Sequence, residues 1–135
     1  MPEYGIATSI ALPFEQAVER TRAALAEQGF GVLTEIDVAA TMKHKLGVDV
    51  PSQLILGACN PPLAYQALQT EESIGLLLPC NVVVRSLGPA ATAVEVVDPA
   101  FLVTATGNAR LGPVADQASA KLRAALGTVL ASCSE

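Results

Sequence analysis

The sequence predicts an α+β fold, a two-layer sandwich in which helices pack on one face of a mainly antiparallel sheet. Segments of alternating or β-branched apolar residues take turns with segments whose apolar residues recur every three or four positions. The connections are short, and Gly88-Pro89-Ala90-Ala91 joins two of the later strands as a hairpin loop. The 135 residues show no internal repeat or linker, so we expect a single domain over residues 1–135.

The first half of the chain is predicted to alternate strands and helices. The expected elements are a strand at 4–10, a helix from Pro13 to a Gly29 cap, a strand at 31–37, a short helix at 38–46 and a strand at 54–58. Asp37 suits the N-cap of the short helix, and Gly47 suits its end. The strand at 54–58 is apolar on both faces, which indicates a central position in the sheet.

The second half is predicted to hold a helix, a hairpin and a final helix. The expected elements are a helix after Asn60, an extended run at 76–80, strands at 81–87 and 92–98, a loop with one helical turn at 100–112 and a helix from Pro113. Several strands carry apolar residues on both faces, as Val82 and Val83 illustrate. Helices cover one face, so we expect a two-fold homodimer to cover the other.

The composition excludes several classes of function. The formal net charge is −5 and the sequence pI is near 4.8, which is the wrong sign for binding nucleic acid or an anionic membrane surface. No apolar run approaches the ~20 residues that cross a bilayer, and the first residues do not resemble a signal peptide. We therefore expect a cytoplasmic protein whose three cysteines are reduced.

Two cysteine boxes, residues 57–62 and 76–81, are the most informative motifs. In the first, Cys59 ends a strand and Asn60-Pro61 opens a helix, because asparagine caps a helix and proline suits its first position. The partial positive charge of a helix N-terminus favours a thiolate at Cys59. In the second, Cys80 directly precedes a valine-rich strand.

Further motifs are spread over the whole chain. They are Gly29-Phe30, Glu35-Ile36-Asp37, Lys45-Leu46-Gly47, the two cysteine boxes and Asp98-Pro99. With these motifs the chain resembles the bacterial and archaeal family called domain of unknown function 302. The resemblance implies a two-layer α+β fold and a homodimer, and it implies no established activity. His44 and Cys133 lie outside the family's pattern.

Cys59 and Cys80 are the first candidates for chemistry. If their strands are neighbours, the two thiols lie within about 5–6 Å, which allows a disulfide or a shared soft metal ion. A structural zinc site needs four ligands, and one subunit offers only the three cysteines and His44. The competing interpretation is that both thiols are small buried hydrophobic groups.

A polar rim of Glu35, Asp37 and Lys45 is predicted around these thiols. Glu35 and Asp37 share a strand face, where they could hold a hard cation or act as an acid–base pair. The alternative is that Asp37 caps the next helix while Glu35 is solvated or paired with Lys45. Asn60 and Asn81 each follow a cysteine and either line the pocket or satisfy backbone groups.

Three hypotheses of function remain open. The first is a homodimeric, non-enzymatic domain that binds a small anionic ligand or a soft metal near the cysteine boxes. The second is a thiol-dependent redox enzyme in which Cys59 reacts and Cys80 resolves the product. The third is a structural interaction module with inert buried cysteines. No phosphate loop, nucleophile elbow or H-E-x-x-H pattern is present in the sequence.

Overall fold

The computed structural model describes residues 3–132, which form five strands and several helices around one sheet. The sheet is antiparallel throughout, with the strand order β1-β5-β4-β3-β2. Its strands are β1 (Gly5–Ile10), β2 (Gly31–Asp37), β3 (Gln53–Cys59), β4 (Cys80–Gly88) and β5 (Ala91–Val97). The predicted α+β class with helices on one face of an antiparallel sheet is confirmed, and β3 has two strand neighbours as predicted.

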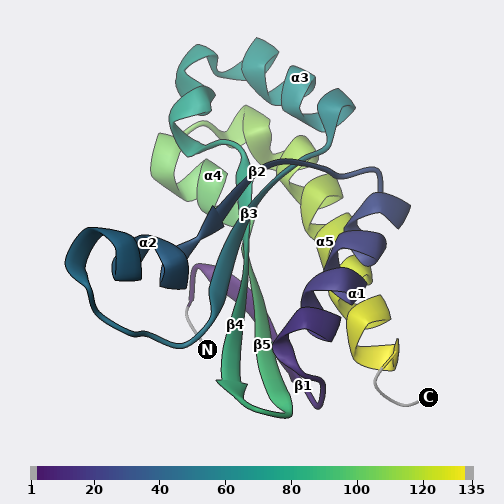
Figure 1. The fold of residues 1–135 in the computed structure, drawn as a ribbon. Coiled ribbons are helices and arrows are strands. Elements are labelled where there is room, and N and C mark those ends of the chain that lie inside the picture. Colours follow the sequence, from purple (N-terminus) through teal and green to yellow (C-terminus); the bar gives the residue numbers. More distant parts are fainter. Residues whose placement is uncertain (1–2, 133–135) are drawn as a thin grey trace.

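Two long helices cover one face of the sheet. They are α1 (Phe14–Glu27) and α5 (Gly112–Ser132), which pack against each other and against the strands (Figure 1). Alternate strand residues such as Leu56, Val84 and Val94 are completely buried beneath them. This sheet core also includes Leu122 of α5. Within residues 3–132, neither α5 nor any other helix has the length and apolar character needed to cross a bilayer.

Shorter helices gather at one end of the sheet (Figure 1). They are α3 (Pro61–Thr70), the 3-10 segments η1 (Glu72–Leu77) and η2 (Ala109–Leu111), and α4 (Ala100–Thr106). Together with the start of α5 they bury a second apolar group, the end core, which comprises Leu63, Ala67, Ile74, Leu102, Leu111, Val114 and Ala118.

The structure corrects two predictions in this region. Residues 76–80 were expected to be extended, but Leu76 and Leu77 belong to η1. The chain turns toward the end core there because the Ile74 side chain is completely buried. Residues 100–112 were expected to form a loop with one helical turn. They instead form α4 and η2, since Leu102 and Leu111 both bury their side chains in the end core.

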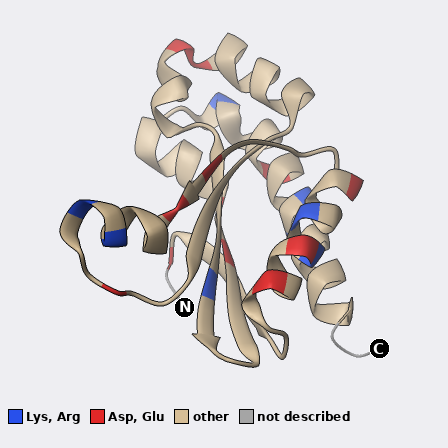
Figure 2. Cartoon of the chain, in the orientation of Figure 1, with Lys and Arg blue, Asp and Glu red and all other residues tan. Residues whose placement is uncertain are grey.

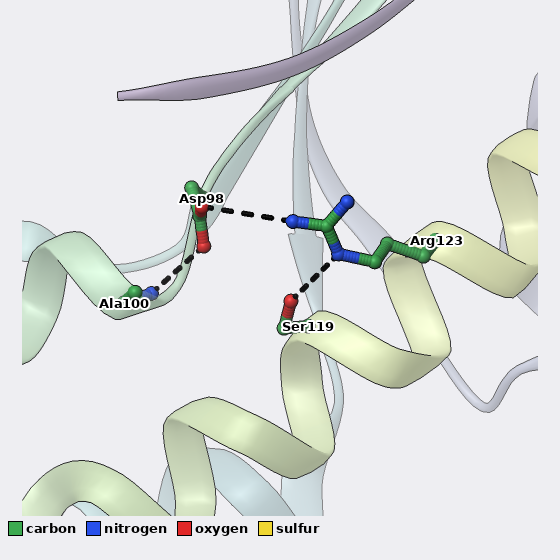
Figure 3. A network of polar contacts seen from close by, with 4 residues as sticks. All are labelled: Asp98, Ala100, Ser119 and Arg123. Carbon is green, nitrogen blue, oxygen red and sulfur yellow. Dashed lines mark hydrogen bonds and ion pairs between the residues drawn. The ribbon is translucent and has the colours of Figure 1, made fainter. Parts of the chain in front are cut away.

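A small polar network ties α4 to α5 (Figure 3). Asp98 follows β5 and accepts a hydrogen bond from the Ala100 amide at 3.0 Å. The other carboxylate oxygen lies 3.8 Å from a guanidinium nitrogen of Arg123, whose Nε donates to Ser119 Oγ at 3.2 Å. These contacts hold the start of α4, just after β5, in the position from which α4 covers the end core.

The strand β2 and the helix α2 (Val38–Leu46) are much less covered than the rest of the molecule. In the described chain, β2 forms an edge of the sheet and α2 contains no buried residue. The predicted caps are both present: Asp37 accepts a hydrogen bond from the Ala40 amide at 2.9 Å, and Gly47 has the left-handed φ of 68°.

Candidate functional site

The first cysteine box is built as the sequence predicts. Cys59 is the last residue of β3, and Asn60 caps α3. The Asn60 side chain accepts a hydrogen bond from the Leu63 amide at 3.4 Å and donates one to the Gln28 carbonyl at 3.2 Å. These two contacts fix the start of α3 against the end of α1, so the turn that carries Cys59 is held on both sides.

The second box brings Cys80 beside the first. Cys80 begins β4 and pairs with Ala58 of β3, the residue before Cys59. Its side chain is buried, while the exposed Asn81 is the next residue along the strand. Adjacent residues of a strand point to opposite faces. Cys80 therefore faces the helices, and Asn81 faces the open side of the sheet.

Both cysteines line one cavity of about 300 Å³ beside the end core. Its walls are the ends of β3 and β4 together with side chains from α3, α4 and α5. The lining residues carry no charge, and their polar side-chain groups are the two thiols and the Asn60 amide. The full lining consists of Phe30, Leu33, Ala58, Cys59, Asn60, Leu63, Ala64, Ala67, Leu68, Gly75, Leu78, Pro79, Cys80, Leu102, Val114 and Ala118. Neither α3 nor α4 contains a charged residue (Figure 2).

The two thiols have different environments. Cys59 is partly exposed, whereas Cys80 is 9% exposed and free of any disulfide. Burial raises the pKa of the Cys80 thiol from 9.0 to about 11, and the nearby Cys59 charge acts in the same direction. Cys80 therefore keeps its proton at neutral pH.

An irregularity in β2 places Leu33 at the cavity. The pairing of β2 with β3 shifts between Val32 and Thr34, so Leu33 has no partner residue in the ladder. Its side chain is 67% exposed and still contributes to the cavity lining. The sequence places Leu33 only within the expected strand at 31–37, because a bulge has no clear signature in this segment.

The predicted polar rim does not assemble at the cavity. Among the predicted site residues, Cys59, Asn60 and Cys80 line it, and Glu35, Asp37, Lys45 and Asn81 do not. Glu35 forms an ion pair with Arg22 of α1 at 2.9 Å rather than with Lys45. The other carboxylate, Asp37, is the α2 cap described above.

Sequence reasoning missed much of the cavity wall. Leu102 comes from α4, in the segment expected to be mostly loop. Leu78 and Pro79 belong to the second cysteine box, and they line the cavity as the chain passes from η1 to β4. Leu102 carries only the signal of an ordinary core residue, because its position at the cavity depends on how the helices pack.

For the hypothesis of a soft metal ion, the structure brings two possible sulfur ligands, Cys59 and Cys80, to the same cavity. Among residues 3–132, no group of three or more His, Cys, Asp or Glu side chains is arranged to hold a metal ion. Cys59 and Cys80 would offer a soft ion two thiolates without a third ligand from these residue types. Cys133 lies outside the described residues.

Comparison with known proteins identifies the family. The family model named domain of unknown function DUF302 matches residues 6–129. The chain belongs to this family. The fold is also similar to a crystal structure of an uncharacterized conserved DUF302 protein from Bacillus stearothermophilus, with 26% identity and a TM-score of 0.87 over 95% of this chain and 99% of that one. No curated protein matches.

Proposed function

We propose that this DUF302 domain binds a small, neutral, apolar molecule in the cavity beside Cys59 and Cys80. The observation that carries the proposal is an open space of about 300 Å³ walled almost entirely by aliphatic side chains. Ligand pockets in proteins start at about this size and have mainly apolar walls with few polar groups. An apolar molecule would replace space that water fills poorly.

The lining favours an apolar ligand over the anion expected from the sequence. An anion would need a cationic side chain or free amide donors, and the lining residues include no lysine or arginine. The Asn60 amide is already engaged by Gln28 and by the start of α3. An apolar ligand needs neither group.

The test is a titration with the neutral fluorophore N-phenyl-1-naphthylamine. We expect saturable binding to the wild-type protein and a loss of at least about tenfold in affinity in Ala118→Leu, which adds three carbons at the cavity wall. Ala120→Leu, at an exposed position of the same helix, is the matched control and should bind as wild type does. Equal affinity of the wild type and Ala118→Leu would contradict the proposal.

The proposal includes a homodimer in the cytoplasm. Five large apolar side chains, Leu33, Ile36, Leu46, Val48 and Val50, are between 40% and 69% exposed within one segment of the chain. An exposed apolar patch of this kind supports a second copy as its cover, because it lies next to the edge strand β2, which pairs with β3 on one side and with no strand of the described chain on the other. The two free thiols support a reducing compartment.

Mass measurement in dilute solution tests the dimer. We expect twice the chain mass of 13.9 kDa for the wild type and a monomer for Leu46→Glu, which places a charge on the patch. Lys45→Glu changes the neighbouring exposed residue and serves as the control for added negative charge. A wild-type monomer would refute this part of the proposal.

The redox hypothesis is the second candidate, favoured by the presence of both thiols in one cavity on adjacent strands. Hydrogen peroxide would oxidise Cys59 to a sulfenic acid, and attack by Cys80 would release water and leave a disulfide. Peptide mapping of the peroxide-treated protein should then show a Cys59–Cys80 cross-link with the loss of two hydrogens. Stable sulfenic acid without a cross-link would exclude this mechanism.

A further inference from the structure

The cavity offers a nucleophile to whatever enters it. Of the polar groups in its lining, the Asn60 amide is held by Gln28 and Leu63, which leaves the two thiols for chemistry. They differ in accessibility, because Cys59 is partly exposed at the end of β3 while Cys80 is buried at the start of β4. Reagents that enter the cavity therefore reach Cys59 more readily.

We propose that Cys59 is a covalent attachment site for neutral, apolar α,β-unsaturated carbonyl compounds that enter the cavity. This inference rests on the proposed binding function and adds the class of ligand and the bond that it forms. A thiolate is a soft nucleophile, and an enone carbon is a soft electrophile, so the pair reacts without a metal or a second catalyst. The apolar wall selects which electrophiles are concentrated beside the sulfur.

The reaction balances without an oxidant. Cys59 loses its thiol proton to water, and its sulfur electron pair forms a bond to the β-carbon of the electrophile. The π pair of the carbon–carbon double bond then forms a double bond between the α-carbon and the carbonyl carbon, and the carbonyl π pair moves to oxygen, which gives an enolate. Water then returns a proton to the α-carbon, so that the net change is addition of S–H across the double bond. No leaving group departs, and no electron leaves the pair of reactants.

Cys80 is expected to stay unmodified during this reaction. It lies in the same lining but is buried. Burial raises its pKa to about 11, so only a small fraction of Cys80 is thiolate at neutral pH. The thiol–enone reaction proceeds through the thiolate, and Cys59 is the more accessible of the two sulfurs, so the addition is expected there. We therefore expect one adduct per cavity, on Cys59 and not on Cys80.

Two matched reagents test the inference. N-phenylmaleimide and N-(4-carboxyphenyl)maleimide share the unsaturated carbonyl group and the ring, and they differ in one carboxylate. The rate of modification at each cysteine is followed by peptide mass mapping, with glutathione as the reference thiol. We expect the neutral-to-charged rate ratio at Cys59 to exceed that of glutathione by at least about tenfold. We also expect Cys80 to remain free.

Variants locate the selectivity in the cavity. Ala118→Leu should bring the Cys59 ratio close to that of glutathione, while Ala120→Leu on the exposed face of α5 should leave it unchanged. A wild-type ratio equal to that of glutathione, or preferential modification of Cys80, would overturn the inference. If N-phenyl-1-naphthylamine still binds in that case, the binding function stands and only covalent capture fails. If the fluorophore does not bind either, both proposals fail.

Discussion

The two apolar cores of this molecule have similar residues but different packing. In the sheet core, the side chains of α5 and of the strands leave a space of only about 10 Å³ around Val82, Val96 and Leu122. In the end core, a cavity of about 300 Å³ remains. Composition therefore does not decide which core is closed. The difference lies in the elements that build each one.

Element length explains the contrast. The sheet core is covered by α1 and α5, with 14 and 21 residues, which lie along the strands so that their side chains can interdigitate with the sheet. The end core is enclosed by only the start of α5 and by the short segments α3, η1 and α4, with 10, 6 and 7 residues, which lie at one end of the sheet. Short helices that meet at angles have fewer side chains with which to fill the space between them.

Truncating one leucine in each core gives the largest expected effects. Leu56→Ala in the sheet core removes a completely buried side chain and should lower the free energy of unfolding by about 3–5 kcal/mol. Leu63→Ala in the cavity wall should cost only about 2 kcal/mol, because that side chain already borders open space and has fewer contacts to lose. Urea denaturation measures both values. Equal losses would contradict the difference in packing.

The buried thiol should make stability depend on pH. The pKa of Cys80 is about 11 in the folded protein and 9.0 when exposed, so unfolding releases a proton between these values. The stabilisation is therefore complete below pH 9 and declines as the pH rises toward 11, by roughly 2–3 kcal/mol in total.

The difference between wild type and Cys80→Ala isolates this contribution. Other groups titrate in the same range, but they are present in both proteins and cancel. In guanidinium titrations, we expect the free energy of unfolding of the wild type to fall relative to that of the variant as the pH rises from 9 to 10.5. This interval lies between the pKa of Cys80 in the unfolded chain, 9.0, and that in the folded protein, about 11. A difference that is constant with pH would show that Cys80 is not desolvated.

Close packing between β2 and β3 is tested at Gly57, which pairs with Thr34 across the two strands. A Cβ atom there would overlap Thr34 Oγ1 and lie 2.9 Å from Pro79 Cγ. We expect Gly57→Ala to cost about 1–3 kcal/mol, and Thr34→Ala in the same chain to recover part of that loss by removing the nearer atom. Thermal denaturation of the single and double variants measures both. Additive losses would argue against this contact as the cause.

The smallest effect is expected at Glu35, which lies outside both cores. Its pairing with Arg22 is largely solvent-exposed, so Glu35→Gln should change the free energy of unfolding by less than about 1 kcal/mol. It should also leave the affinity for N-phenyl-1-naphthylamine unchanged, because Glu35 does not line the cavity. A clear loss of binding in Glu35→Gln would support the polar rim that the sequence predicted.

Local signals explain what the sequence could predict. Asn60 and Asp37 cap helices, and Gly29 and Gly47 take positive φ, because these roles depend only on neighbouring residues. Whether the Cys59 and Cys80 strands are neighbours was left open by the sequence, and the structure pairs β3 with β4. The fold class and the local structure of the first cysteine box could be predicted because they depend on such local signals.

Features that depend on tertiary packing were out of reach. The β-branched residues of Ala100–Thr106 do not favour a helix strongly, and α4 forms because Leu102 is buried in the end core. Arg22 reaches Glu35 only after α1 packs beside β2. The side of Asn81 was predictable in principle, since a residue next to Cys80 on a strand must point to the opposite face.

Xenon at elevated pressure, diffused into crystals of the protein, tests the central claim most directly. Xenon occupies apolar cavities that are too large to collapse and too apolar to hold ordered water. We predict xenon density in the end core, beside Cys59 and Cys80, and none in the sheet core beneath α1 and α5. An end core that excludes xenon would contradict the existence of an apolar binding cavity in this fold.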